Sequence, residues 1–305
     1  MSFKKLNYMK YRKLFFTVST ILVILGIVSL FIFKMNLGID FSSGTRVDIQ
    51  GKHALSIDKL TDTVESLGYE AERPTLAGNN NNFASVTLNK VLNQDQINQL
   101  QQKIQKDMGY KPTVSTVSPA VGRELAKNAF WAVIISSIFI IIYVWIRFEF
   151  LQGLTAVIAL LHDAFFIITI FSLLHIEVNA VFIAALLTII GYSINDTIVT
   201  FDRVRENVKL KKGKLTSFED YKEIVNKSIQ QTIVRSINTV LTVLIPVIAL
   251  LIFGSPSIRT FTIAMFIGLI AGVYSSIFIA APLWAVMKFK HDQRQKKKKV
   301  RPQQS

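Results

Sequence analysis

Six stretches of the chain consist mainly of apolar residues, almost without charge, and each contains at least 18 residues. A helix needs about 20 such residues to cross the roughly 30 Å hydrocarbon core of a bilayer. The sequence therefore predicts an α-helical polytopic membrane protein with six transmembrane helices. These spans are Leu14 to Phe33, Ala129 to Ile146, Leu154 to Leu174, Val178 to Thr200, Thr232 to Phe253 and Phe261 to Met287.

Residues 35–127 separate the first two spans and show the periods of short strands and helices. TRVDIQ, NFASVTLN and PTVSTV alternate as strands do, and a further strand is expected near EAERPTL, before a hairpin tip at AGNNNN. SIDKLTDTVESLGY, capped by Ser56, and LNQDQINQLQQKIQKDMGY have helical spacing. The order βαββαβ predicts an α+β domain of ferredoxin-like type. Without a phosphate loop, and with His53 its single histidine, the domain favours a binding or mechanical role over catalysis.

Lys and Arg are concentrated at the N-terminus, after the fourth span and in the tail KFKHDQRQKKKKV. Because short cytoplasmic loops are enriched in these residues, both termini are expected in the cytoplasm and residues 35–127 outside. Residues 1–34 then form a cytoplasmic N-terminus and an uncleaved first span, since no small-residue cleavage site follows it. Residues 128–287 contain spans two to six with a cytoplasmic loop at 201–231, and residues 288–305 form a basic cytoplasmic tail.

The net charge of +15 follows mainly from this topology, and basic segments also attract anionic lipids. We favour this interpretation over contact with ribosomal RNA or another cytoplasmic partner, and expect no nucleic acid partner. The absence of cysteine excludes disulfides and thiolate chemistry.

An acidic residue, Asp196, lies inside the fourth span near its cytoplasmic end. Charged residues are costly in a bilayer, so those found there are rare and usually functional. The fourth and fifth spans each carry a polar stripe at the spacing i, i+3, i+4, i+7, which places its members on one face. These stripes are Ser193, Asp196, Thr197 and Thr200, and Arg235, Asn238, Thr239 and Thr242. Asp196 and Arg235 lie at similar depth, so an ion pair between them is geometrically allowed.

Hydrogen bonding between helices is the alternative role for polar residues inside a membrane. For Asn195, Asn238 and the threonines both roles stay open. For Asp196 pure packing is disfavoured, because an amide would form the same bonds without a charge to bury. The third span adds His162 and Asp163 near its centre, too deep to reach the interface. We favour packing over proton transfer for His162, and the two roles are balanced for Asp163.

Small residues recur every four positions along the sixth span. They are Ala264, Gly268, Gly272, Ser276 and Ala280. Such a face allows another helix backbone to approach closely. It predicts a packing surface for a neighbour in this chain or in a second subunit.

A buried acid beside a movable arginine can bind and release a proton as the arginine moves or water enters. Protonation then changes which helices prefer to pair, and one charge crossing 100 mV supplies about 2.3 kcal/mol. We therefore predict a proton-driven machine in which Asp196 and Arg235 form the proton pathway. No catalytic residue, metal or cofactor is expected apart from the proton as coupling ion, and the chain is not expected to be an enzyme. Sodium in place of the proton stays open.

Four strings carry a resemblance to a known family: GIDFSSGT after the first span, HD in the third, GYSINDTIVTFDRVREN ending the fourth, and QTIVRSINTVLT opening the fifth. From about residue 14 to 287 the chain resembles SecF, the smaller subunit of the bacterial SecDF protein-export complex, in the resistance-nodulation-division superfamily. Asp196 and Arg235 match that family's intramembrane proton-pathway residues. Where the family often has GIDFTGGT, this chain has Ser42 and Ser43.

The resemblance implies six spans and an extracytoplasmic ferredoxin-like domain, in the bacterial cytoplasmic membrane. It also implies a SecD partner, the SecYEG channel as neighbour, and an unfolded preprotein handled outside. The function expected is that of an accessory subunit of the Sec translocase, which uses the proton motive force to promote preprotein translocation. Met1 and the basic tail favour a chain separate from SecD over a piece of a fused protein.

Three other functions fit part of the pattern. An intramembrane aspartyl protease also needs two acids on adjacent helices, but its Gly-x-Gly-Asp and Pro-Ala-Leu motifs are replaced here by SIND and APLW. A small-molecule or lipid exporter of the same superfamily usually carries both halves in one chain, with larger outer domains. A non-catalytic assembly scaffold would conduct no protons, so proton flux in reconstituted vesicles distinguishes it.

Overall fold

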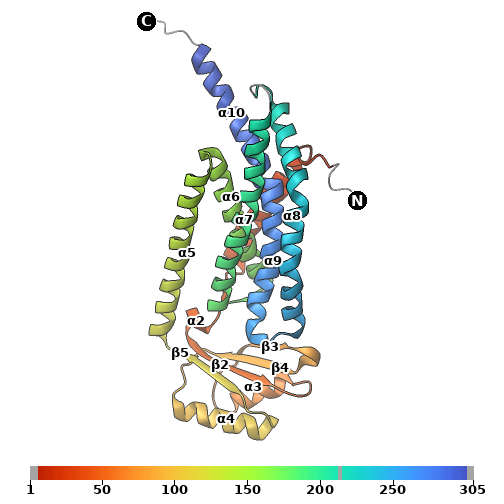
Figure 1. Cartoon of the computed structure of the whole chain (residues 1–305). Helices are drawn as coiled ribbons and strands as arrows, with labels where there is room; N and C mark the ends of the chain where they lie inside the picture. The colour runs from red at the N-terminus through yellow and green to blue at the C-terminus, as the bar shows by residue number, and fades with distance from the viewer. Residues whose placement is uncertain (1–5, 212–214, 301–305) are drawn as a thin grey trace.

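The computed structural model describes residues 6–211 and 215–300 of the chain. Within these residues, six helices are long and apolar enough to cross a membrane, which confirms the six predicted spans. They form a bundle, and a small sheet domain lies at one end of it (Figure 1). Lys4 and Lys5 of the predicted basic N-terminus lie outside the described residues, as does the end of the basic tail.

The central helix of the bundle is α7, which packs against α6, α8 and α9, whereas α5 stands at the edge (Figure 1). The sixth span is one long helix that contains a π-helical turn in its middle. The bundle consists of α1 (Arg12–Ile32), α5 (Pro119–Arg147), α6 (Phe150–Leu173), α7 (Ala180–Leu210), α8 (Phe218–Phe253), α9 (Arg259–Ser275), the π-helical turn (Ser276–Ala280) and α10 (Ala281–Val300).

Helices α7 and α8 extend beyond the predicted spans, so most of the segment 201–231, predicted as a loop, is helical. The apolar spacing continues there through the buried residues Val204 and Tyr221. Where the two helices meet, the Lys211 ammonium donates a hydrogen bond to Asp220 (2.7 Å), and this bond raises the pKa of Lys211. The two helices therefore pack against each other beyond the predicted spans.

The domain at the other end of the bundle, here called the outer domain, has the predicted element order βαββαβ. Its elements are β2 (Gly44–Gln50), α3 (Ile57–Glu65), β3 (Glu72–Ala77), β4 (Phe83–Leu88), α4 (Gln94–Met108) and β5 (Thr113–Val117). The antiparallel sheet has the strand order β3-β4-β2-β5. Its residues Val47 and Ile49 pack with Leu60 of α3 and Leu100 of α4, on the face away from the bundle (Figure 1). The other face of the sheet is turned towards the bundle.

Three short elements that the sequence does not predict connect the outer domain with the bundle. They are β1 (Asn36–Leu37), α2 (Ile39–Ser42) and β6 (Glu177–Val178), and β1 pairs with β6 in parallel. Elements of two to four residues carry too little periodic pattern to be recognised.

Candidate functional site

The polar stripe predicted on α7 lies in the middle of the bundle and contacts three neighbouring helices. The Ser193 hydroxyl donates to Asp163 on α6 (Oγ to Oδ2, 2.6 Å). The Thr197 hydroxyl bonds Ser276 at the π-helical turn (Oγ1 to Oγ, 2.8 Å). Asp196, between these two in sequence, is turned towards α8. The stripe therefore joins α7 to several helices instead of facing a single one.

Asp196 is half-buried in the bundle, with its carboxylate between α8 and α9. Its Oδ1 accepts a hydrogen bond from the Ser236 hydroxyl on α8. Its Oδ2 is buried and has no hydrogen-bond partner among the described residues. A cavity of about 10 Å³ adjoins the carboxylate and is also lined by Ser193 and Gly272. A space of about 10 Å³ is close to the smallest that holds one water molecule, and Asp196, Ser193 and Ser236 are polar groups in its wall.

Arg235 does not form the ion pair with Asp196 that the sequence allows. Its side chain is exposed on the outside of the bundle, and it forms no ion pair with any residue in the described part of the chain. Its charge still lies close enough to act on Asp196 electrostatically. The reason is angular: successive helix residues are about 100° apart, and the next residue, Ser236, is the one buried against α7.

The rest of the stripe predicted on α8 also points outward: Asn238 and Thr242 are exposed and Thr239 is half-buried. Asn195 on α7 is exposed as well. Because α7 and α8 run antiparallel and contact each other through Asp196 and Ser236, the residues just before these two point to the same side of the helix pair. We call this side, formed by Asn195, Arg235, Asn238 and Thr242, the outer polar face.

A second carboxylate, Asp163, lies in the middle of α6 and is only 1% exposed. Its Oδ2 accepts hydrogen bonds from Ser193 on α7 and Ser275 on α9, both at 2.6 Å. Its Oδ1 lies 3.3 Å from His162 Nδ1. Within the described residues, no group of three or more His, Cys, Asp or Glu side chains could hold a metal ion. His162 and Asp163, the two polar residues of the third span, belong to one hydrogen-bonded cluster with Ser193 and Ser275.

The small-residue face of α9 packs against α7 of the same chain. Of the two neighbours that the sequence allowed, a helix of this chain or a second subunit, this face contacts the first. A Cβ added at Gly268 would lie 2.4 Å from the Ile189 side chain. A Cβ added at Gly272 would lie 3.2 Å from Ser193 Cβ. This close approach brings Ser276 within hydrogen-bond distance of the α7 stripe.

Two serines of the site, Ser236 and Ser275, were not predicted from the sequence. A signal exists for the first, because Ser228, Thr232 and Ser236 recur every four residues on α8 and are all buried. This small polar stripe lies on a different face of α8 from the stripe headed by Arg235. Ser275 has no comparable signal, because its role depends on a carboxylate from another helix.

A short segment joins the outer domain to the beginning of α7. We call the contact between residues 36–44 and 177–180 the joint. Asp40 Oδ2 accepts a hydrogen bond from the backbone N–H of Ala180, the first residue of α7 (2.9 Å). A Cβ added at Gly38 would lie 2.2 Å from a carboxylate oxygen of Glu177 on β6, so a larger residue there would require the Glu177 side chain to move. The joint therefore ties the outer domain directly to the helix that carries Asp196.

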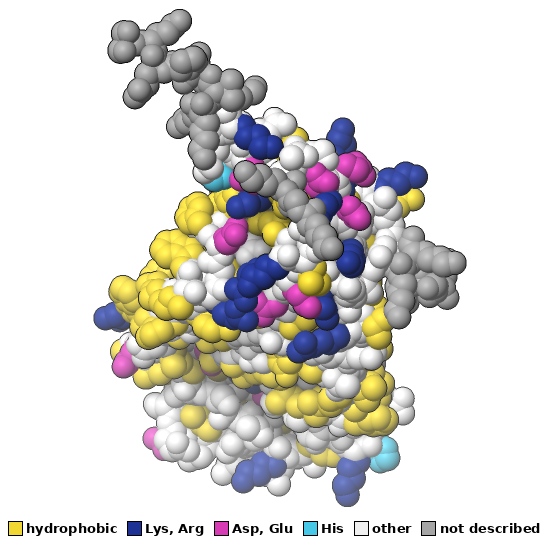
Figure 2. Space-filling view, turned by 45° about the horizontal axis from the view of Figure 1, so that its top comes forward, with side chains coloured by type: hydrophobic (Ala, Val, Ile, Leu, Met, Phe, Trp, Pro, Cys, Tyr) yellow, Lys and Arg dark blue, Asp and Glu magenta, His cyan; other side chains and the backbone are white. Residues whose placement is uncertain are grey.

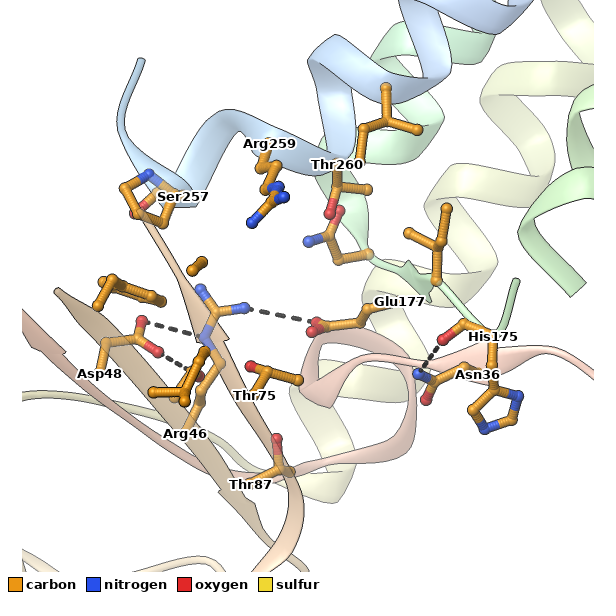
Figure 3. Close-up of a pocket in the computed structure, with 18 of the residues that line it drawn as sticks. Asn36, Arg46, Asp48, Thr75, Thr87, His175, Glu177, Ser257, Arg259 and Thr260 are labelled. Carbon is orange, nitrogen blue, oxygen red and sulfur yellow. Dashed lines mark hydrogen bonds and ion pairs between the residues drawn. The ribbon is translucent and has the colours of Figure 1, made fainter. Parts of the chain in front are cut away.

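An ion-pair network lies beside the joint (Figure 3). Arg46 on β2 pairs with Glu177 of β6 (Nη1 to Oε1, 3.4 Å) and with Asp48 of its own strand (Nε to Oδ2, 3.2 Å). These side chains line a polar cavity of about 370 Å³ between the sheet and the bundle, whose wall includes Arg259 at the start of α9. The outer domain thus faces both α7 and α9 across this cavity.

The sequence matches two descriptions of protein-export membrane proteins. Residues 96–290 match "Protein export membrane protein SecD/SecF, C-terminal" and residues 28–54 match "SecD/SecF GG Motif". The chain belongs to the SecD/SecF family. The longer match includes α5 to the first half of α10, and the shorter one includes residues 36–44 of the joint.

Relatives of this SecD/SecF chain are similar over nearly all of it. The protein translocase subunit SecDF of Bacillus subtilis is 50% identical, over 94% of this chain and 38% of that protein. The protein translocase subunit SecF of Alicyclobacillus acidocaldarius is 42% identical, over 88% of this chain and 89% of that protein. A crystal structure of SecDF from Thermus thermophilus, described as a translocon-associated membrane protein, superposes with a TM-score of 0.83 at 33% identity.

The Thermus comparison covers 94% of this chain and 39% of the SecDF chain. The present chain therefore spans less than half of these SecDF proteins and most of the SecF relative.

The SecD/SecF GG motif has an unusual backbone in this chain. Ser43 has φ of +63° and Gly44 has φ of +131°, a region that L side chains rarely adopt. A Cβ added at Gly44 would lie 2.5 Å from the Leu88 carbonyl oxygen, so this second position requires glycine. The first position keeps its positive φ even with serine in place of the glycine often found there.

The charged string that ends α7 in this family member holds helices together. Asp202 pairs with Arg147 at the end of α5 (2.8 Å) and with Arg205 on its own helix (3.3 Å). Asn207 is buried and donates to Ser228 on α8 (2.8 Å). These contacts hold α7 against α5 and α8. Asp196, which precedes these residues on α7, lies instead among the polar side chains in the middle of the bundle.

Proposed function

We propose that this chain is an accessory subunit of the Sec protein translocase that uses inward proton movement to promote preprotein translocation. Membership in the SecD/SecF family and the similarity to translocase subunits support the translocation role. The chain hydrolyses nothing in this account. Its work is a movement of the outer domain, driven by binding and release of a proton at Asp196.

One observation carries this proposal: α7 bears both Asp196 and the bundle side of the joint. Asp40 bonds the first residue of α7, and Asp196 follows about 24 Å along the same helix. A charge change at Asp196 alters how α7 pairs with α8 and α9. Since a helix moves as a rod, that change reaches the outer domain through the joint.

The outer polar face fits a SecD partner. Polar and charged side chains that face lipid are costly, so Arg235 and Asn238 favour a protein neighbour over hydrocarbon. A second six-span unit seated there would also set how strongly the Arg235 charge acts on Asp196, because it would exclude water from between them. The names of the SecDF relatives support such a partner.

The charge distribution supports an orientation with both termini in the cytoplasm of a bacterial cell. Lys and Arg side chains gather at the end of the bundle that carries the α7–α8 hairpin, above a wide hydrophobic band (Figure 2). Short cytoplasmic segments are enriched in these residues, and they attract anionic lipids. The outer domain then lies outside, where it would meet the preprotein emerging from the SecYEG channel.

The test is Asp196→Asn in the complex with SecD, assayed for secretion driven by an imposed proton gradient. We expect the variant to insert and assemble normally and to lose the stimulation by the gradient, because the amide cannot bind and release the proton. The matched control is Asp202→Asn, the same substitution further along α7, where the carboxylate pairs with Arg147 at the helix end. Unchanged stimulation in Asp196→Asn would overturn the proposal.

Two further measurements separate the alternatives. Proton uptake by vesicles that contain the reconstituted complex is expected with the wild type, whereas a scaffold would show none. Replacing the proton gradient with a sodium gradient is expected to remove the stimulation. Stimulation by sodium alone would reassign the coupling ion.

A further inference from the structure

The proposed function uses Asp196 but leaves the buried carboxylate of Asp163 without a task. Three different helices contribute to its surroundings: His162 on α6, Ser193 on α7 and Ser275 on α9. Both serine hydroxyls reach the same oxygen, Oδ2, at 2.6 Å. A carboxylate oxygen can accept two hydrogen bonds, and here donors from two different helices use both positions of Oδ2.

The charge of this cluster requires a proton. Among the described residues, no Lys or Arg forms an ion pair with Asp163, and His162 is the only titratable side chain in contact with it. A carboxylate in a membrane interior without a counter-charge is unfavourable. An ionised Asp163 beside a neutral His162 has a net charge of −1. The pair becomes neutral when one proton is added, either to the Asp163 carboxylate or to the His162 imidazole.

A short route connects this pair with Asp196. Ser193 donates to Asp163 and also lines the cavity of about 10 Å³ beside Asp196. Asp196 lines the same cavity, and its Oδ2 is buried without a hydrogen-bond partner among the described residues. One water molecule in the cavity would supply the missing partner of Asp196 and reach the Ser193 hydroxyl.

The other end of the pair faces a second cavity. His162 Nε2 is buried and has no hydrogen-bond partner among the described residues, and the side chain is 9% exposed. It lines a cavity of about 570 Å³ between α1, α6 and the start of α10, to which Ser19 and Thr20 of α1 also contribute. The other residues of this wall are apolar, so His162, Ser19 and Thr20 are the polar groups that border the cavity.

We infer that Asp163 and His162 form a second proton-binding site, joined to Asp196 through Ser193 and one water molecule. The transfer balances: Asp196 gives its proton to the water, the water gives one to the Ser193 oxygen, and the Ser193 hydroxyl gives its own to Asp163. Only protons move, so no group is oxidised or reduced. This inference rests on the proposed proton-driven function and adds the second acceptor that such a route needs.

The experiment uses the complex with SecD in vesicles and measures proton uptake and infrared absorption. In Asp163→Asn we expect the carbonyl stretch of a protonated carboxyl group to change and proton uptake to fall by about 100-fold. In Ser193→Ala the carboxyl stretch persists, because Ser275 and His162 still contact Asp163, while proton uptake falls similarly. The matched control is Ser29→Ala, which loses a buried hydroxyl bond between α1 and α6 (2.9 Å, to Ser172) and should conduct normally.

The outcomes separate the two proposals. If the wild type takes up protons, Asp196→Asn does not, and both Asp163→Asn and Ser193→Ala behave as wild type, the second site is refuted and the proposed function stands. If the wild type takes up no protons, the proposed function fails, and the infrared difference still decides whether Asp163 holds a proton. Should Asp163→Asn fail to fold, Ser193→Ala alone decides: normal uptake refutes the route.

Discussion

The charge of Asp196 is controlled by very few neighbours. Its Oδ1 accepts a hydrogen bond from Ser236, the Ser276 hydroxyl at the π-helical turn also stabilises its charge, and the Arg235 charge acts on it from outside the helix pair. A hydrogen bond to a charged group contributes about 1.5–3 kcal/mol. Ser236 therefore stabilises the charged carboxylate at close range, and Arg235 adds an influence that depends on what covers the outer polar face.

The variant Ser236→Ala tests whether the Ser236 hydroxyl stabilises the charged form of Asp196. Loss of the donor makes the charged form of Asp196 less favourable, so release of the proton becomes harder and transport should slow by about tenfold. The initial rate of proton uptake by vesicles containing the complex measures it. The matched control is Thr232→Val one turn earlier, which removes a buried hydroxyl bonded only within α8. Equal rates for Ser236→Ala and wild type would exclude this role.

The sequence reveals Asp196 but not its partner, and the reason is physical. A carboxylate inside an apolar run is rare, so Asp196 is conspicuous, and so is Asp163. Helical spacing identifies the residues that share a stripe, but it does not say which neighbour the stripe faces. The contact with α8 falls on Ser236, about 100° around the helix from Arg235, and only the packing of whole helices decides this.

At the scale of elements, the contact between α7 and α9 determines the geometry of both carboxylates. The glycines of α9 allow α7 to approach until Ile189 fills the space at Gly268. Ser275 and Ser276 follow along the same helix, at the π-helical turn, and contact α6 and α7. Such turns occur frequently at functional sites.

Gly268→Ala is expected to loosen this contact. The added methyl group would overlap the Ile189 side chain, and overpacking costs about 1–3 kcal/mol. We predict a lower melting temperature in detergent and partial recovery when Ile189→Ala is added. Gly191→Ala is the control, because nothing lies within 4 Å of a Cβ at that position of α7. The same melting temperature for Gly268→Ala and wild type would contradict the tight packing.

Elements with a long periodic pattern are predictable here, and short ones are not. The six spans and the βαββαβ order follow from apolar runs and from alternation over five or more residues. The β1–β6 pair has two residues in each strand, and its partners are far apart in the chain. The hairpin of α7 and α8 is missed for another reason: its helical surface is mostly polar, although residues such as Val204 continue the buried stripe.

At the scale of the whole molecule, the joint is the mechanical link between the bundle and the outer domain. It combines the parallel pairing of β1 with β6 and the hydrogen bond from Ala180 to Asp40, and the ion pair of Arg46 with Glu177 lies beside it. These contacts connect the sheet to the first turn of α7. A movement of α7 is therefore expected to displace the outer domain as a unit.

Weakening the joint should reduce secretion, whereas locking it should change neither activity. Asp40→Ala combined with Glu177→Ala removes a hydrogen bond of the joint and the ion pair beside it, so we expect proton uptake to persist while stimulation of secretion falls. A disulfide between Leu37→Cys and Val178→Cys, which are paired in register, should leave both activities intact because the joint moves as one piece. Both activities are measured in the same vesicles. Loss of secretion on locking, or its retention on weakening, would contradict a rigid joint.

The central claim, that protonation of Asp196 moves the outer domain, is tested most directly by a distance. The chain has no cysteine, so spin labels can be placed at Gln102→Cys on α4 and Ser255→Cys before α9, both exposed. In vesicles with an imposed proton gradient, we predict that the distance distribution between the labels shifts in the wild-type background and stays fixed with Asp196→Asn. An equal shift in both would contradict the claim.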